Sequence, residues 1–347
     1  MNINLLITCV LCALGGAAYA QSSNTVYGVV DTGLVRESGG AAGNVTKLTG
    51  GVESGTRLGF RGVEDLGGGL RALYTLEMGI LADTGASGQG GLAFGRQAWV
   101  GIGGAPGQIS LGRQYTPLFL ALNTIDPFGA VSTAGTAANL MSIGGIRMNN
   151  TIKYSLADLG GFNADVSYGL GEVAGDNTAG RQIGALLGYT SGPLNIKLAY
   201  HTANSVPTAQ SPSSVNGRTT MVGATYDFNV VKVAAAVAVN KGAVSVSGTP
   251  QIDSRDILVG ATVPLGAGKL MASYIKKDDR TGITIRDARQ WGIGYTYLLS
   301  KRTALYTAYG RINNTAAAGQ PGFYTVGNAS DLGTGDRAFN LGIRHSF

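Results

Sequence analysis

Few side chains in this sequence could carry out catalysis. His201 and His345 are the two histidines, and both cysteines, Cys9 and Cys12, lie in an apolar N-terminal stretch. Nucleophilic catalysis needs a nucleophile with a base beside it, and we find no spacing of His, Cys, Asp and Glu typical of a metal site. The sequence therefore predicts that the protein is not an enzyme and that it uses no cofactor and no metal.

Charged residues alternate with apolar ones, which fixes the face that each of them occupies. Leu58 and Phe60 share one face of an extended segment, so Arg57 and Arg61 share the other. The same alternation places Glu77 opposite its apolar neighbours, and Lys153 lies between Ile152 and Tyr154. Successive side chains of a strand point to opposite sides, so one side of each strand is apolar and the other carries charge.

Such period-2 segments run through the chain and predict an all-β fold. Sixteen of them are about ten residues long, an even number, which is typical of an antiparallel transmembrane β-barrel. The segments are 24–36, 55–64, 69–80, 93–103, 107–114, 148–157, 161–170, 181–190, 194–203, 218–228, 230–240, 254–264, 267–277, 288–298, 302–311 and 337–347.

The connections between these segments alternate in length, as the periplasmic turns and extracellular loops of such barrels do. Long ones are expected at 37–54, 81–92, 115–147, 171–180, 204–217, 241–253, 278–287 and 312–336. The connection at 115–147 is the longest and is mostly small or apolar, so we expect it to fold into the lumen. Tyr189, Phe228 and Tyr297 close their segments at the short turns, which indicates an aromatic girdle.

Both ends of the chain agree with export to an outer membrane. Residues 1–20 read as a signal peptide, with an apolar core and an A-x-A pattern ending at Ala20. Residues 21–347 would then form the barrel, whose last segment alternates up to Phe347. The charged fraction is 13% and there are 56 glycines, both unusual for a soluble domain. The net charge of +6 shows no basic run, so we expect no nucleic-acid partner.

Several motifs resemble those of the Gram-negative general porins, in particular the beta-proteobacterial branch. The resemblance covers the whole chain after residue 20 and is looser over 171–336. The stretches that carry it are Ser23–Gly33 (SNTVYGVVDTG), Thr56–Leu70 (TRLGFRGVEDLGGGL), Gly95–Gly101 (GRQAWVG), Leu111–Pro117 (LGRQYTP), Arg147–Tyr154 (RMNNTIKY) and Gly342–Phe347 (GIRHSF).

The resemblance implies a homotrimer of sixteen-stranded barrels, each with a water-filled channel narrowed by an inward-folded third loop. Arg57, Arg96 and Arg147 would form a basic wall by motif position, although alternation alone does not settle the face of Arg96. On the loop, Pro127 stands where the family has a glutamate, so the acidic side would rest on Asp126. We add as candidates the residues that complete the two sides: Arg61, Arg113 and Lys153 on the basic wall and Glu77 on the acidic side.

Clustered Arg and Lys side chains in a pore favour anions, and arginine stays charged at any working pH. We therefore expect an outer-membrane porin for passive diffusion of small hydrophilic solutes, with a preference for anions. Expected partners are outer-membrane lipid and lipopolysaccharide, further copies of the chain, and small solutes and ions. A substrate-specific outer-membrane channel and a plugged structural or adhesin barrel remain the alternatives.

Overall fold

The computed structural model describes residues 22–130, 134–141, 145–207, 216–242, 252–281, 286–315, 324–327 and 333–347. The predicted signal peptide lies outside the described residues. The strands are β1 (Ser23–Gly40), β2 (Gly43–Gly50), β3 (Arg57–Gly67), β4 (Leu70–Gly79), β5 (Gln97–Gly104), β6 (Gly107–Tyr115), β7 (Arg147–Leu159), β8 (Phe162–Gly169), β9 (Gln182–Ser191), β10 (Leu194–Asn204), β11 (Asn216–Asp227), β12 (Lys232–Gly242), β13 (Ile252–Leu265), β14 (Gly268–Asp279), β15 (Ala288–Leu298), β16 (Thr303–Asn314) and β17 (Arg337–Ser346). Three short helical segments accompany them: α2 (Gly88–Gly91), α3 (Pro117–Ile125) and the 3₁₀ turn η1 (Ala137–Asn139).

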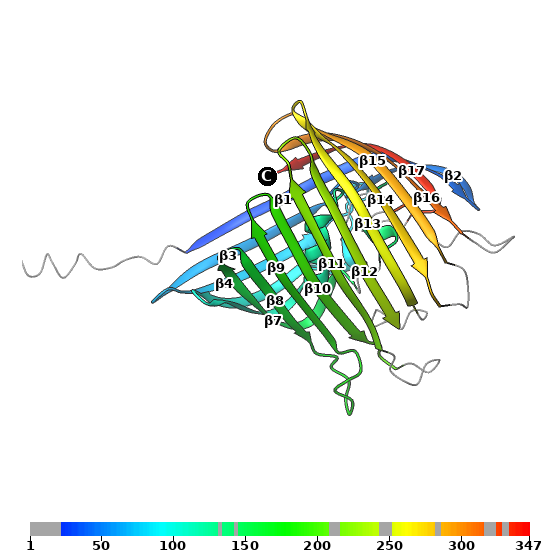
Figure 1. Ribbon diagram of the computed structural model, residues 1–347. Coiled ribbons are helices and arrows are strands. Elements are labelled where there is room, and N and C mark those ends of the chain that lie inside the picture. Colours follow the sequence, from blue (N-terminus) through cyan, green and yellow to red (C-terminus); the bar gives the residue numbers. More distant parts are fainter. Residues whose placement is uncertain are drawn as a thin grey trace, which may run out of the picture.

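The strands close into one antiparallel ring, which Figure 1 shows as a tilted barrel. From β3 to β17 each strand pairs with the next one along the chain, and β1 closes the ring by pairing with β17, for example Val30 with His345. The other edge of β1 pairs first with β3 and then with β2. Because β2 and β3 follow one another along that edge, they share one position, and the ring has the sixteen positions that the sequence predicts.

The predicted loop 37–54 is wrong in its first part. β1 continues to Gly40, and β2 returns beside it over Gly43–Gly50. Glu37, which is 2% exposed, forms an ion pair of 2.6 Å with Lys47 across the hairpin. Because the two charges neutralise each other, both residues can stay in the paired strands. The chain leaves the sheet only after Gly50 and re-enters it at Arg57.

The alternation of faces is confirmed along the strands. On β17, Phe339, Leu341 and Ile343 are 44–52% exposed, whereas Ala338 and Asn340 between them are buried. Inward-facing residues are covered by the segments that fold into the lumen, and outward-facing apolar residues form the surface that contacts membrane lipid. Backbone pairing between neighbouring strands runs around the whole ring, with local shifts of register in the pairs β1–β2, β3–β4, β6–β7 and β7–β8. Such closed pairing is the requirement for crossing hydrocarbon.

The aromatic residues at the short turns gather in pairs. Tyr226 and Phe228 have ring centroids 4.5 Å apart, and Phe162 lies 4.6 Å from Tyr189 across neighbouring strands. Phe228 and Tyr297 are 54% and 43% exposed on the outer surface. These contacts agree with the aromatic girdle expected from the sequence.

The long connection after β6 folds into the ring, as expected. Thr116 caps α3 by accepting a hydrogen bond from the Phe119 amide, and Pro117 opens the helix. In Figure 1 the coiled ribbon lies inside the barrel, against the inner faces of β8 to β12. Leu118, Leu122 and Ile125 are at most 2% exposed, so the apolar face of the helix packs on the wall.

Glycines on the inner wall make room for this loop, which accounts for part of the glycine excess. A Cβ added at Gly223 would lie 2.4 Å from Ile125 Cδ1, and one at Gly260 would lie 2.5 Å from Pro127 Cγ. One at Gly310 would lie 2.0 Å from the Ala134 carbonyl oxygen. Side chains at these positions would push the loop towards the centre of the lumen.

Candidate functional site

Three arginines meet on one side of the lumen at the long-loop end of their strands. Arg57 opens β3, Arg96 directly precedes β5, and Arg147 opens β7. They border a cavity of about 260 Å³ together with Tyr115 and residues of α3. We call this space the loop-side cavity, and the three arginines the basic cluster. The sequence interpretation of all three as neighbours in the lumen agrees with this placement.

Tyr115 holds the basic cluster together. Its hydroxyl accepts hydrogen bonds from Arg96 Nη2 at 2.7 Å and from Arg147 Nη2 at 3.2 Å. The Arg147 guanidinium also stacks over the Tyr115 ring at 4.7 Å, and its Nε donates to the Arg96 carbonyl at 2.7 Å. Arg57 Nη2 donates to Ser54 Oγ at 3.1 Å. These neutral acceptors orient the guanidinium groups and, unlike a carboxylate, leave their charge in place.

The placement of Glu77 corrects the sequence expectation. Glu77 does face the lumen, but it lies within the basic wall, where Oε1 accepts from Arg96 Nε at 2.8 Å and Oε2 from the Tyr27 hydroxyl at 2.9 Å. In the register of β4 and β5, Glu77 lies opposite Gln97, and Arg96, one residue before β5, donates its backbone amide to the Glu77 carbonyl at 3.0 Å. The two residues are therefore held next to each other where β5 begins. Glu77 thus neutralises one arginine, and the basic cluster with Glu77 carries a formal charge of +3 − 1 = +2.

Asp126 does not form an exposed acidic side either. It ends α3 and is 5% exposed, and its carboxylate accepts hydrogen bonds from the amides of Phe128, Ala130 and Ala137 at 2.7–3.0 Å. Burial raises the pKa of Asp126 to about 6, against the opposing effect of these amide donors. The hydrogen bonds of the carboxylate are therefore made to backbone amides of the loop, and they stabilise the turn after α3.

The remaining candidates lie away from the basic cluster. Arg61 is on the same inner face nearer the short turn, where its guanidinium lies 5.3 Å from the Tyr27 ring centroid. Lys153 is on the inner face of β7, between Ser110 and Ser167 of the neighbouring strands. Neither borders the loop-side cavity.

The expectation that Arg113 belongs to the basic wall is wrong. Arg113 shares the outer face of β6 with Ile109 and Leu111, which are 52% and 50% exposed. Its guanidinium donates to the Gly95 carbonyl at 2.7 Å and contacts Asn149. Alternation within β6 alone would have placed it outside.

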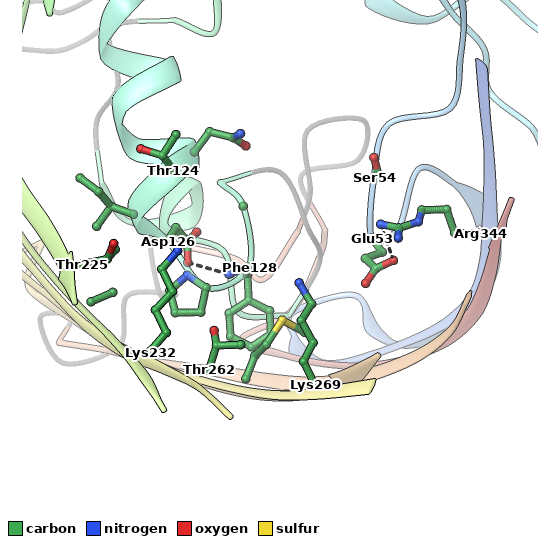
Figure 2. Close-up of a pocket in the computed structure, with 16 residues that line it drawn as sticks. Glu53, Ser54, Thr124, Asp126, Phe128, Thr225, Lys232, Thr262, Lys269 and Arg344 are labelled. Atoms are coloured by element: carbon green, nitrogen blue, oxygen red, sulfur yellow. Dashed lines mark hydrogen bonds and ion pairs between the residues drawn. The ribbon is translucent and has the colours of Figure 1, made fainter. Parts of the chain in front are cut away.

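Sequence reasoning missed a second group of lumen residues at the short-turn side. Lys232 of β12, Lys269 of β14 and Arg344 of β17 border a cavity of about 380 Å³ below the loop. Figure 2 shows Lys232 and Lys269 extending from the wall strands towards Asp126 and Phe128. We call this space the turn-side cavity. Lys232 shares its face with the buried Ala234 and Ala236, so alternation could have identified it.

The segment between β2 and β3 also turns into the lumen. The Asp31 carboxylate accepts hydrogen bonds from the amides of Val52 at 3.0 Å and Ser54 at 2.8 Å, and from the Tyr306 hydroxyl at 2.6 Å. Glu53 thereby reaches Arg344, with an ion pair of 3.1 Å that is drawn in Figure 2. Asp31 therefore anchors this inward turn.

The two cavities share Ser54 and Asn123, one from the β2–β3 segment and one from α3. The two cavities therefore adjoin at these two residues. The loop-side cavity has the basic cluster beside it, and the turn-side cavity has Lys232 and Lys269. Neither lysine forms an ion pair with another described residue.

The part of the chain that the structure describes has neither a membrane-spanning helix nor a cluster of metal ligands. No helix there is long and apolar enough to cross a membrane. No group of three or more His, Cys, Asp and Glu residues there is placed to hold a metal ion.

A closed sixteen-position barrel with an apolar outer face, an inward-folded loop and a charged lumen defines an outer-membrane channel protein. Comparison with known proteins gives the family: a model described as Gram-negative porin matches residues 8–317, and the chain belongs to this family of channels. It is 34% identical to outer membrane porin protein 32 of Delftia acidovorans, with 99% of each chain covered. It is 30% identical to an outer membrane porin protein of Bordetella pertussis over the full length of both.

A solved structure supports the same assignment. The anion-selective porin from Comamonas acidovorans superposes with a TM-score of 0.78 at 31% identity, covering 94% of this chain and all of that one. The protein is thus an outer-membrane porin, and porins are diffusion channels rather than enzymes.

Proposed function

We propose that this porin forms a water-filled channel that prefers small anions and that the basic cluster sets this preference. The observation that carries the proposal is the imbalance of charge beside the loop-side cavity. Arg57, Arg96 and Arg147 meet one carboxylate, Glu77, and the loop carboxylate of Asp126 is occupied by backbone amides. Fixed positive charge around a narrow passage lowers the energy of anions and raises that of cations.

The turn-side cavity extends the same preference along the passage. Arg344 is balanced there by Glu53, whereas Lys232 and Lys269 have no carboxylate partner among the described residues. An anion leaving the basic cluster past Ser54 and Asn123 would meet these two lysines next. The anion selectivity named for the Comamonas porin is consistent with this order of charges.

Swelling of liposomes that contain the purified porin tests the proposal. Solutes of matched size, such as gluconate, glucose and protonated glucosamine, enter through the channel at rates that report its selectivity. We expect gluconate to enter fastest and glucosamine slowest at low ionic strength, because the Debye length is then long. Equal rates would contradict the charge assignment, entry of one solute alone would favour a substrate-specific channel, and no entry would favour a plugged barrel.

Three further expectations belong to the same proposal. We infer that the porin works as a homotrimer in contact with lipid and lipopolysaccharide, since the outer faces of β1, β5 and β6 expose apolar residues such as Val26, Val100 and Ile109. Light scattering in detergent measures the oligomer. We also infer that residues 1–20 are removed on export, and the mass of the purified protein checks cleavage before Gln21.

A further inference from the structure

Basic residues line the outer face of one half of the barrel, at the long-loop ends of the strands. Each residue lies next to a buried, inward-facing residue on its strand, so each points away from the lumen. Cross-strand register makes them three directly opposed pairs: Arg218 with Lys241, Lys276 with Arg289, and Arg311 with Arg337.

Two more cations complete the row. Arg255 of β13 points outward between the first two pairs, and Arg36 of β1 follows the third pair. Every strand from β11 through β17 to β1 therefore contributes one outward cation at the same end of the barrel. We call this row the cationic arc.

Like charges directly opposite one another on neighbouring strands are destabilising. Nearby carboxylates offset only part of the charge: Asp336 pairs with Arg337 at 2.8 Å, Asp253 lies opposite Lys241, and Asp278 lies opposite Arg255. Three opposed pairs of cations on one face therefore form a site for a bound anion, which would turn repulsion into bridging hydrogen bonds.

The arc lies at one level relative to the membrane. Aromatic or aliphatic residues occupy the next outward position below it: Tyr274 under Lys276, Trp291 under Arg289 and Phe339 under Arg337. These are 41–48% exposed, as expected for residues that face lipid, and one outward step along a strand is about 7 Å. The cations thus stand just above the apolar band on the extracellular side, where the headgroups of the outer leaflet lie.

The other half of the barrel lacks this feature among its described strands, so the arc is not a general excess of charge. Outward positions near the long-loop ends of β3, β5, β8 and β9 are Leu58, Ala98, Tyr168 and Ile183. Arg113 of β6 and Arg181, which directly precedes β9, are cations on that side, and each lies beside an uncharged residue of the neighbouring strand, Ala98 and Asn204. A ligand recognised by the arc would bind one flank of the barrel and leave the other flank for different contacts.

We propose that the cationic arc binds the phosphate groups of the phosphorylated glycolipid of the outer leaflet. This inference rests on the outer-membrane location and deepens the proposed lipopolysaccharide contact by naming its site. Arginine presents a planar fork that matches phosphate oxygens, and within the described part of the chain Arg337 alone among the six opposed residues forms a close ion pair. The repeated spacing from strand to strand suits a ligand with more than one phosphate.

The test compares the variant Lys276→Gln/Arg289→Gln with the control Lys301→Gln/Arg302→Gln. The control removes two exposed cations from the β15–β16 turn at the opposite end of the barrel. Binding of bisphosphorylated lipid A to the porin in nanodiscs is measured for both, with dephosphorylated lipid A and phosphatidylglycerol as further probes. Each basic residue near an anionic membrane surface contributes about fivefold to binding. We therefore expect about 25-fold weaker binding for the arc variant and unchanged binding for the control.

Three results would overturn the proposal: unchanged lipid A binding in the arc variant, equal binding of the dephosphorylated form, or equal binding of phosphatidylglycerol. Conductance of both variants in bilayers without glycolipid tests the channel function independently of lipid A binding. Wild-type conductance in both shows that the barrel is intact, whereas loss of conductance in the wild type itself would refute the proposed function and not the arc.

Discussion

Removing charge from Arg147 in two equal steps should shift ion selectivity in two equal steps. Arg147→Gln lowers the formal charge of the basic cluster with Glu77 from +2 to +1, and Arg147→Glu lowers it to 0. Gln keeps hydrogen-bonding capacity towards Tyr115 and so limits changes in the shape of the passage. The graded pair separates the effect of charge from the effect of altered packing.

The size of each step follows from Coulomb's law. A unit charge about 5 Å from a permeating ion in an aqueous passage contributes about 0.8 kcal/mol, with opposite sign for chloride and potassium. The difference between the two ions is then about 1.7 kcal/mol, which screening at 0.1 M salt reduces to about 1 kcal/mol. Each unit of charge should therefore change the chloride-to-potassium permeability ratio about fivefold, and Arg147→Glu about 25-fold.

Reversal potentials of single channels in planar bilayers under a potassium chloride gradient measure the ratio. Arg61→Glu is the matched control: it lies four residues further along the inner face of β3, about 13 Å from Arg57, which exceeds the Debye length. Its shift should be less than that of Arg147→Gln. Equal shifts for Arg61→Glu and Arg147→Glu, or no shift for Arg147→Glu, would refute the assignment of selectivity to the basic cluster.

Three other changes test how the loop is held. Asp126→Asn should leave the permeability ratio unchanged and increase the noise of the open-channel current. The reason is that the substitution removes hydrogen-bond acceptors from buried loop amides, at a cost of about 1–3 kcal/mol each. A rise in anion preference would instead show that Asp126 acts as the acidic side of the passage. Gly260→Val should lower conductance, since its Cβ would lie 2.5 Å from Pro127 of the loop and would push the loop into the lumen. Gly103→Ala is the control, because the nearest atom to its Cβ is the flexible end of the Leu73 side chain. Equal effects of the two substitutions would contradict the claim that the wall glycines make room for the loop. Lys277→Met should lower the free energy of unfolding by about 3–5 kcal/mol, measured as a lower midpoint of thermal unfolding. Lys277 Nζ bridges the Asp256 carboxylate at 2.9 Å and the carbonyl of Leu140 in the loop, so its removal leaves a buried carboxylate without this cation. Adding Asp256→Leu should recover part of the lost stability, and no recovery would contradict this explanation.

The faces of the strands could be predicted from the sequence because a membrane barrel repeats every two residues. Leu58 and Phe60 located Arg57 and Arg61 on the inner face, and the final strand was placed residue by residue. Arg113 was assigned to the basic wall against this rule, although it has the same parity as Ile109 and Leu111, which places it on the outer face.

Partners could not be predicted, because alternation gives a direction and not a neighbour. Glu77 was expected to oppose the arginines, and it pairs with Arg96, which directly precedes β5 and whose backbone amide bonds to the Glu77 carbonyl. Asp126 was expected to face the lumen, and a turn of the loop wraps amides around it. The inward segment at 51–56 depends on Asp31 and Tyr306, which are far apart in sequence.

The most direct test of the account is the reversal potential of the unmodified porin under a tenfold potassium chloride gradient at neutral pH. A basic cluster that keeps a net charge of +2 beside the loop-side cavity predicts stepwise conductance with a reversal potential displaced towards the chloride equilibrium potential. Stepwise conductance with a reversal potential at zero, or displaced towards potassium, would contradict the central claim that these arginines select for anions.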